Sequence, residues 1–211
     1  LAEGRFDAVL YGDIEGHLDA SAAKRIAESA KHIPICIVDA QDDPIDHRAE
    51  MAERLETDHF ACYFKREMLS CWEYGPSTVP LPFAYSDGRL PRELNETRTH
   101  DLFWAGHRQF GLRRLYLEHI ESTFKIDLSR GFTQDEYSAA LARSRIGLSI
   151  FGFGFDTVRY WEVPAHGCML LAERPPIRIP FNFHDGESAV YFDDLPDLEK
   201  KLAHYLEHPD Q

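Results

Sequence analysis

One segment in the second half of the chain combines residue types that can bind an anion. Residues 146–174 read IGLSIFGFGFDTVRYWEVPAHGCMLLAER, and the apolar start of this segment predicts a buried strand. Gly152 and Gly154 then allow the backbone to turn sharply and to approach a ligand closely. Asp156 or Thr157 can cap a helix that follows. Because free N–H groups and the positive end of the helix dipole meet at such a helix start, the segment can hold a phosphate.

The helix predicted after this bend carries two side chains that suit a nucleotide ligand. Arg159 and Glu162 are three residues apart and therefore share a face. The helix ends at His166, and Gly167 follows where a left-handed cap is expected. A guanidinium can bind phosphate and a carboxylate can accept hydrogen bonds from hydroxyl groups. The alternatives are a surface ion pair between Arg159 and Glu162, and a capping role for His166.

A second possible anion site follows the apolar residues 102–105. Gly106 ends this run and precedes a segment rich in arginine. In parallel sheets ligands gather at the carboxyl ends of strands, so the backbone N–H groups near Gly106 and His107 can meet a diphosphate. Arg113 or Arg114, about one helical turn further on, can add a bidentate contact. The alternative is that both arginines belong to a solvated helix face.

The elements that must position these residues alternate between strands and helices. Apolar runs predict strands at 8–11, 34–38, 60–64 and 79–83, with helices at 20–31 and 44–56 between them. After residue 100 the pattern predicts strands at 101–106, 123–128, 146–151, 168–173 and 189–193, and helices at 109–121, 134–143, 157–166 and 195–207. Strands that alternate with helices favour parallel βαβ units and an α/β fold.

A polar connector divides the chain into two predicted domains. Residues 86–100, SDGRLPRELNETRTH, contain Gly, Pro and many charges but few apolar side chains. We therefore expect an N-terminal domain over 1–88 and a C-terminal domain over 98–211. Within the second, Thr133 and Glu136 form a capping box that marks the start of a helix.

Composition excludes some classes of function. Apolar residues make up 44% of the chain, which favours a globular protein over a disordered one. The formal net charge of −13 argues against nucleic acid as a partner, because binding to its backbone needs lysine and arginine. A single nucleotide remains possible, since a local group such as Arg108, Arg113 and Arg159 can act within an acidic whole.

Cysteine and histidine usage gives no sign of a metal centre. The four cysteines show no metal-like pairing and read as reduced thiols, and the eleven histidines are scattered along the chain. No run is long enough to cross a bilayer and no signal peptide opens the sequence. We expect a cytoplasmic location, with peripheral association at the inner membrane face also allowed. Because the chain opens almost directly on a strand and closes at a helix end, we expect a piece of a longer protein.

Several segments together resemble a known family. VRYWEVPAHGCMLLAE at 158–173 resembles the donor-site helix of GT-B glycosyltransferases, in particular the spore-maturation-type (CgeB-like) branch. ACYFKREM at 61–68 and VPLPFAYS at 79–86 resemble the end of the N-terminal domain of that fold. DLFWAGHR at 101–108 resembles the first strand and phosphate loop of its C-terminal domain. These segments occur in the order that the family has.

The resemblance implies a GT-B fold, with two Rossmann-like domains whose parallel sheets face a cleft, the N-terminal one apparently truncated. It implies transfer of a sugar from a nucleotide-diphosphate-sugar donor, held as substrate, to a glycan, protein or small-molecule acceptor, with no cofactor and no catalytic metal. The donor-binding residues that it indicates are Gly106, His107, Arg113, Gly154, Arg159, Glu162, His166 and Gly167. Among these, Glu162 matches the carboxylate that binds the donor ribose, and Arg159 and His166 would face the diphosphate.

The sequence departs from the retaining members of the family at one position. Those enzymes often carry a second Glu eight residues before the ribose-binding one, and here that position is Gly154. Asp156, two residues away, is a possible substitute. Retention or inversion of configuration therefore stays open. A nucleotide-sugar epimerase or phosphorylase on the same fold and a non-catalytic nucleotide-sugar or glycan-binding module are alternatives.

The acceptor side offers several candidates for a general base. Asp13 and His17 follow the first predicted strand, where loops of this architecture carry catalytic groups. Asp39, Asp42 and Asp43 follow the second. The residues alone do not choose between the two sets.

Two cations follow the third predicted strand. Lys65 and Arg66 lie at its end, where they can touch the donor phosphate or an acidic acceptor. Solvated surface charge is the alternative.

Overall fold

The structure is a computed structural model that describes residues 6–12, 19–30, 32–57, 59–91, 94 and 97–209. The chain divides into two compact units. Unit 1 comprises Leu1–Pro82 together with Pro176–Pro180, and unit 2 comprises Phe83–Pro175 with Phe181–Gln211. The acceptor-base candidates Asp13 and His17 lie outside the described residues.

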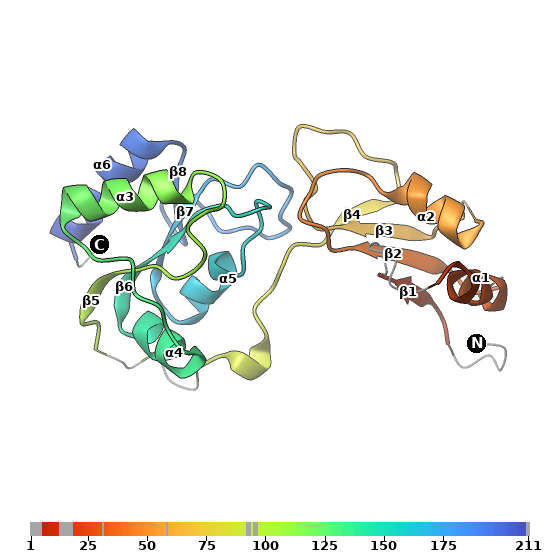
Figure 1. Ribbon diagram of the computed structural model, residues 1–211, viewed down its shortest axis with the longest axis horizontal. Coiled ribbons are helices and arrows are strands. Elements are labelled where there is room, and N and C mark those ends of the chain that lie inside the picture. Colours follow the sequence, from red (N-terminus) through yellow and green to blue (C-terminus); the bar gives the residue numbers. More distant parts are fainter. Residues whose placement is uncertain are drawn as a thin grey trace. The chain divides into compact units, whose positions relative to one another are not determined.

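Unit 1 contains a four-stranded parallel sheet in the order β1-β2-β3-β4 (Figure 1). Its elements are β1 Val9–Tyr11, α1 Ala20–Ser29, β2 Ile35–Asp39, α2 Arg48–Leu55, β3 Cys62–Lys65 and β4 Thr78–Pro80. Because successive parallel strands are adjacent, right-handed crossovers place α1 and α2 on the same face of the sheet. Alternate strand residues pack against them, among them Ile35, Ile37 and Tyr63.

Local signals in the sequence fix the ends of the helices of unit 1. The Asp19 carboxylate accepts a hydrogen bond from the Ala22 N–H at 2.7 Å and so caps the start of α1. Helix α2 ends at Glu56, which adopts a left-handed conformation with φ of 50°. Both helices are amphipathic and bury one stripe of side chains, including Met51 and Leu55 of α2.

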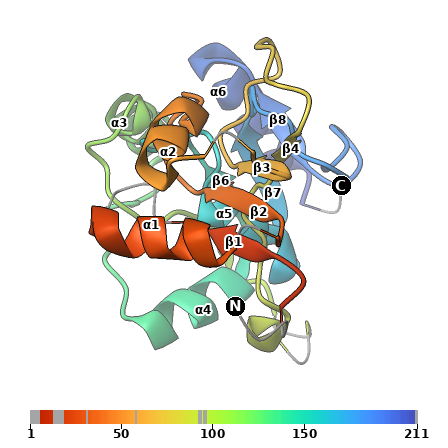
Figure 2. The same cartoon turned by 90° about the vertical axis from the view of Figure 1, so that its right-hand side faces the viewer.

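Unit 2 contains a second four-stranded parallel sheet, in the order β5-β6-β7-β8. A short 3₁₀ turn at Asp87–Arg89 precedes it. Its elements are β5 His100–Phe103, α3 Arg113–Phe124, α4 Gln134–Ala142, β6 Ser144–Ser149, α5 Val158–Ala165, β7 Met169–Glu173, β8 Val190–Phe192 and α6 Leu195–Glu207. Figures 1 and 2 show α3 and α6 on one side of this sheet and α4 and α5 on the other. The prediction of an α/β fold with two parallel sheets is confirmed.

The two faces of the second sheet are packed differently. On one face the main core brings together side chains of α3 and α6 with alternate strand residues such as Ile146, Leu148 and Phe192. On the other face α5 lies very close to β6. A Cβ atom at Gly147 would stand 2.5 Å from Cγ2 of the fully buried Val163, so only glycine lets the helix approach to this distance.

One predicted strand is wrong. Residues 123–128 do not form a strand, because α3 continues to Phe124 and ends at Lys125, which has a φ of 59°. Ile126 and Leu128 still pack on the core, which explains the alternating apolar pattern. The Leu128 N–H donates to Glu121 Oε1 at 3.1 Å. A segment fixed by a side chain can therefore show the period of a strand without joining a sheet.

The capping box predicted at Thr133 is confirmed. Thr133 Oγ1 accepts from the Glu136 N–H at 3.4 Å, and Glu136 Oε2 accepts from the Thr133 N–H at 2.9 Å, so α4 begins where the sequence indicates. In the part of the chain that the structure describes, no helix is both long and apolar enough to cross a membrane.

Candidate functional site

Two loops meet at the carboxyl edge of the sheet in unit 2. One follows β5 and the other follows β6, and these neighbouring parallel strands bring both loops to the same edge. The rings of Phe110 and Phe153 lie 4.2 Å apart between centroids. A Cβ atom at Gly111 would lie 3.6 Å from the Gly152 carbonyl oxygen. The loops that carry the two predicted anion sites are therefore packed side by side.

Arg113, the first residue of α3, ties these loops together. Its Nε and Nη2 donate to the Ile150 carbonyl at 3.2 and 3.1 Å, and its Nη1 donates to the His107 carbonyl at 3.2 Å. The side chain is buried, and burial lowers its pKa. A Cβ atom at Gly152 would lie only 2.9 Å from Nη2, so glycine makes room for it. Arg113 is thus neither solvated nor placed for a bidentate ligand contact, and it acts by shaping the loops.

Arg159 is held against the first loop. Its guanidinium carbon lies 4.1 Å from the centroid of the Trp104 ring, and its Nη1 donates to the Ala105 carbonyl. Its Nε is buried without a hydrogen-bond partner. Gly106 adopts a φ of 142°, and a Cβ atom there would lie 2.8 Å from Nη1. Arg159 therefore occupies space that exists because residue 106 is glycine.

The surroundings of Arg159 disfavour its charge. Burial, followed by the neighbouring charge of Arg113, lowers the pKa of Arg159 to about 10. The group remains a cation at neutral pH. Among the described residues no carboxylate lies within ion-pair distance of it, whereas Arg108 pairs with Glu121 at 2.7 Å. Arg159 is thus a partly buried cation for which the described part of the chain supplies no counter-ion.

A cavity of about 330 Å³ opens beside Arg159. Aromatic side chains and arginines make up much of its wall. It is lined by Trp104, Ala105, Gly106, Arg108, Leu128, Ser129, Arg130, Gly131, Phe132, Tyr137 and Arg159. A second cavity of about 220 Å³ shares Trp104, Leu128, Arg130 and Phe132 with the first and extends along β5. The site thus combines flat apolar surfaces with cationic groups.

Glu162 pairs with Tyr137 and not with Arg159, the partner that the alternative interpretation of the sequence gave it. The Tyr137 hydroxyl donates to Glu162 Oε2 at 2.6 Å. Burial, together with this hydrogen bond, raises the pKa of Tyr137. Among the described residues Arg159 and Glu162 form no ion pair, although they share a helix face. Tyr137 lines the cavity and Glu162 does not, so the carboxylate is connected to the cavity through the phenol.

The structure does not bring His166 and Gly167 to this cavity. His166 caps the far end of α5, where its Nδ1 lies 2.9 Å from the Glu162 carbonyl oxygen. Arg98 donates to the carbonyls of His166 and Gly167, both at 2.9 Å. Gly167 has the expected left-handed φ, of 69°. These two residues end the helix at the amino edge of the sheet, the opposite edge from Gly106 and Arg159.

Gly154 and Asp156 shape the second loop. The Gly154 carbonyl accepts from the Gly152 N–H at 3.0 Å, which closes the turn. Asp156 is buried and accepts hydrogen bonds from the Phe83 N–H and, at 2.9 Å, from Trp161 Nε1. Its carboxylate is therefore already engaged by the protein. The N-cap of α5 is Thr157, whose side chain makes no capping hydrogen bond.

A family model described as glycosyl transferase-like matches residues 98–211, more than half of the 211-residue chain, and covers the whole cavity. The chain belongs to this glycosyl transferase-like family. Its resemblance to glycosyltransferases, noted from sequence segments, is confirmed at this level.

The glycosyl transferase-like chain is similar to a structure titled "Crystal structure of GtfA/B complex", with a TM-score of 0.48 and 11% sequence identity. The similarity covers 88% of this chain and 48% of that one, so this chain spans about half the length of the matched structure. No curated protein matches it.

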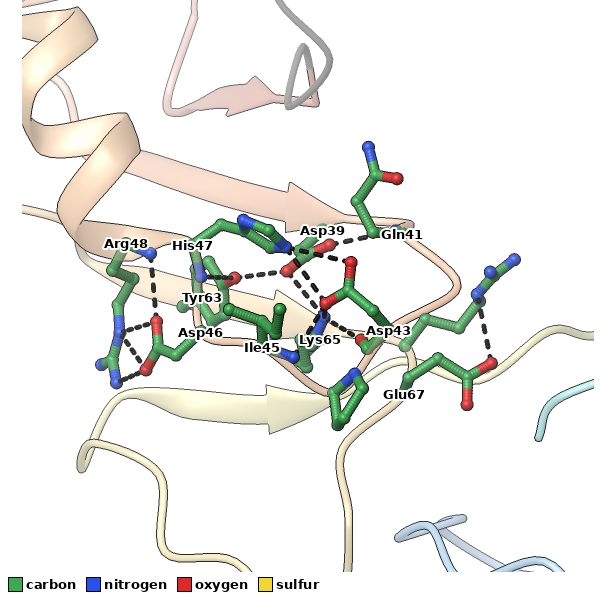
Figure 3. A network of polar contacts seen from close by, with 12 residues as sticks. Asp39, Gln41, Asp43, Ile45, Asp46, His47, Arg48, Tyr63, Lys65 and Glu67 are labelled. Carbon is green, nitrogen blue, oxygen red and sulfur yellow. Dashed lines mark hydrogen bonds and ion pairs between the residues drawn. The ribbon is translucent and has the colours of Figure 1, made fainter. Parts of the chain in front are cut away.

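Unit 1 of the glycosyl transferase-like chain carries a polar network at the carboxyl ends of β2 and β3 (Figure 3). Lys65 is fully buried, and its Nζ donates to Asp39 Oδ2 at 2.9 Å and to the Asp43 carbonyl at 2.6 Å. The Tyr63 hydroxyl also donates to Asp39. Lys65 is therefore not a solvated charge, because a buried ammonium needs such partners. It fixes the loop that follows β2.

The acidic candidates after β2 all have partners. Asp43 lies 3.1 Å from His47 Nε2 and is partly exposed, while Asp42 pairs with Arg66. Asp39 is fully buried. Of these three carboxylates, Asp43 is the one that is partly exposed and also lies beside a histidine, His47. The assignment of an acceptor base stays a prediction.

Sequence reasoning missed several residues of the cavity wall. Trp104 was predicted only as part of the apolar run 102–105, and Phe132, Tyr137 and Arg130 were not singled out. A signal for Tyr137 existed, because it follows the Thr133 capping box by one helical turn. Among the described residues, no group of three or more His, Cys, Asp or Glu side chains is arranged to hold a metal ion.

Proposed function

We propose that unit 2 binds a nucleotide-diphosphate-sugar in the cavity beside Arg159 and that the protein transfers the sugar to a hydroxylated acceptor. The observation that carries this proposal is the partly buried guanidinium of Arg159, which lines the cavity and has a buried Nε without a hydrogen-bond partner and no counter-ion among the described residues. A glycan, a protein or a small molecule can serve as acceptor. Within the glycosyl transferase-like family, we assign the chain to the spore-maturation-type branch, which its sequence segments resemble.

The electrostatics of the cavity favour an anionic ligand. A charge that is partly removed from water is unfavourable until it is paired, and desolvation already lowers the pKa of Arg159. A diphosphate would supply the missing negative charge, and Gly106 lets the Arg159 guanidinium lie against the loop that follows β5, at the wall of the cavity. As the glycosidic bond breaks, the leaving diphosphate gains charge, which a nearby cation stabilises. In this proposal Arg159 and backbone N–H groups take the part that a metal ion plays elsewhere.

The remainder of the cavity suits the nucleoside. Trp104 and Phe132 provide flat apolar surfaces against which a base can pack. Tyr137, with Glu162 behind it, provides a polar position for the ribose. The charged and the aromatic parts of the wall lie within one cavity, as a nucleotide requires.

Replacement of Arg159 by methionine tests the proposal. Calorimetry would measure the affinity of wild-type and variant protein for uridine, guanosine, adenosine, cytidine and thymidine diphosphates. Loss of a charge-assisted contact of about 1.5–3 kcal/mol should weaken the best ligand by about 10- to 100-fold. Arg114→Met is the matched control, because Arg114 is exposed and pairs with Glu118 outside the cavity. Equal affinity of Arg159→Met and wild type would contradict the proposal.

A binding module without catalysis is the second candidate. Gly154 stands where related retaining enzymes carry a Glu, and Asp156, the possible substitute, is engaged by Trp161 and the Phe83 N–H. Incubation with the bound nucleotide-sugar and mass spectrometry of the products distinguishes the candidates. Intact donor after prolonged incubation with glycan acceptors would favour a module, and an isomerised donor would favour an epimerase.

A further inference from the structure

Tyr137 stands between the carboxylate of Glu162 and the cavity. Its hydroxyl donates to Glu162 Oε2 at 2.6 Å, and Tyr137, unlike Glu162, belongs to the cavity wall. A phenol can donate one hydrogen bond, and here the Glu162 carboxylate accepts it. The lone pairs of the phenol oxygen therefore remain available as acceptors. Of the two hydrogen-bonded side chains, Tyr137 is therefore the one that a ligand in this cavity can contact in the conformation that the structure shows.

The position of the phenol is set by two independent supports. The Tyr137 ring packs edge-on against Phe103, with 5.1 Å between centroids. The capping box of Thr133 and Glu136 fixes the start of α4, the helix that carries Tyr137. A hydrogen bond to an ionised acceptor is short and strong, and it increases the electron density on the donating oxygen. Glu162 thus both orients Tyr137 and makes it a better acceptor.

We propose that Tyr137 is the residue that reads the ribose hydroxyls of the donor, and that Glu162 is a positioning residue that acts through it. This inference rests on the proposed function, because it assumes that the cavity holds a nucleotide. It differs from direct binding of the ribose by Glu162, the role that the sequence resemblance implied.

The two arrangements predict opposite effects of Tyr137→Phe. When Glu162 binds the ribose directly, removal of the phenol hydroxyl frees Oε2, and the preference for a ribonucleotide stays or increases. When Tyr137 is the acceptor, its removal leaves a ribose hydroxyl facing an apolar ring, and the preference is lost. The outcome is a ratio of two affinities for one variant, and a general loss of packing would lower both affinities together.

The experiment measures, by calorimetry, the affinity of each nucleoside diphosphate and of its 2′,3′-dideoxy counterpart. Wild-type protein should favour the ribonucleotide by about tenfold, which is the size of one hydrogen bond at 1.4 kcal/mol per tenfold. For Tyr137→Phe the ratio should fall to about one, while affinity for inorganic pyrophosphate stays unchanged. For Glu162→Gln the ratio should be intermediate, because the amide oxygen can still accept the phenol proton.

Tyr160→Phe is the matched control. Tyr160 is a buried tyrosine of α5 whose hydroxyl bonds to Asn182 and Tyr191 and makes no contact with Glu162. Its ratio should equal that of the wild type. A wild-type ratio near one, or a tenfold ratio that persists in Tyr137→Phe, would overturn the inference and leave the proposed function intact. Absence of any nucleotide binding by the wild type would overturn both.

Discussion

The close packing of α5 on β6 gives a quantitative prediction for Gly147→Ala. The added Cβ would lie 2.5 and 2.6 Å from the two methyl carbons of Val163, whereas carbon atoms pack best at about 3.5–4.0 Å. The helix must therefore move away by about 1 Å or more. Such overpacking typically costs about 1–3 kcal/mol, and contact with two methyl groups places this site near the upper limit. With about 2–4 °C per kcal/mol for a chain of this size, the melting temperature should fall by about 6–12 °C.

The double variant Gly147→Ala/Val163→Ala tests the reasoning. Val163→Ala alone removes the two methyl groups and leaves a void beside β6, so it should destabilise the protein as well. In the double variant the new Cβ fills part of that void. The free energy of unfolding should therefore fall by about 1–3 kcal/mol less than the sum of the two single losses. Chemical denaturation followed by circular dichroism measures all four proteins. Additive effects would refute the claim that these two side-chain positions compete for one space.

The same displacement should reach the cavity. Arg159 lies one turn before Val163 on α5 and depends on contacts with Trp104 and the Ala105 carbonyl. Gly147→Ala should therefore weaken nucleoside diphosphate binding, and the double variant should regain much of it. A Gly147→Ala protein that binds as tightly as wild type would show that the loop position of Arg159 does not depend on α5.

Three further predictions follow from buried groups. Burial raises the pKa of Glu173 in the folded protein. Ionisation of Glu173 therefore destabilises the fold as the pH rises above the pKa that this side chain has in the unfolded chain. Between about pH 4 and 7 the melting temperature of Glu173→Gln should rise relative to that of the wild type. Cys71 is exposed whereas burial raises the pKa of Cys168 to about 11, so a maleimide at pH 7.5 should label Cys71 quickly and Cys168 only after unfolding. Lys65→Met should cost about 3–5 kcal/mol in denaturation experiments, because Asp39 would remain as a buried charge without its cation.

Much of the fold could be predicted because the strands are short, apolar and regularly spaced. The alternation of Ile35, Ile37 and Asp39 against Cys36 and Val38 reflects a sheet covered by helices on one face, and the structure has this arrangement. The failure at 123–128 came from Ile126 and Leu128, which face the core from a segment without strand pairing. The period of apolar residues indicates which side chains are buried. It does not indicate whether the backbone of the segment pairs with a neighbouring strand.

The candidate site was predictable only in part, for a related reason. Gly106 and Arg159 could be proposed because their residue types have restricted uses at strand and helix ends. Their mutual contact, in which one takes the space of the missing side chain of the other, depends on loop geometry that the sequence does not display. The partner of Glu162 likewise came from a different helix, 25 residues earlier in the chain, and not from its own.

The stretch Pro176–Pro180 has a practical consequence for dissecting this molecule. Its Ile177 bridges Leu69, and the Ser70 N–H and the Arg178 N–H exchange hydrogen bonds with the Pro176 and Met68 carbonyls at 2.8 and 2.7 Å. Five residues from late in the polypeptide thus complete the architecture of its early portion. Expression of residues 1–82 alone would omit this segment. A minimal fragment that contains all of unit 1 therefore needs Pro176–Pro180 as a fused pentapeptide.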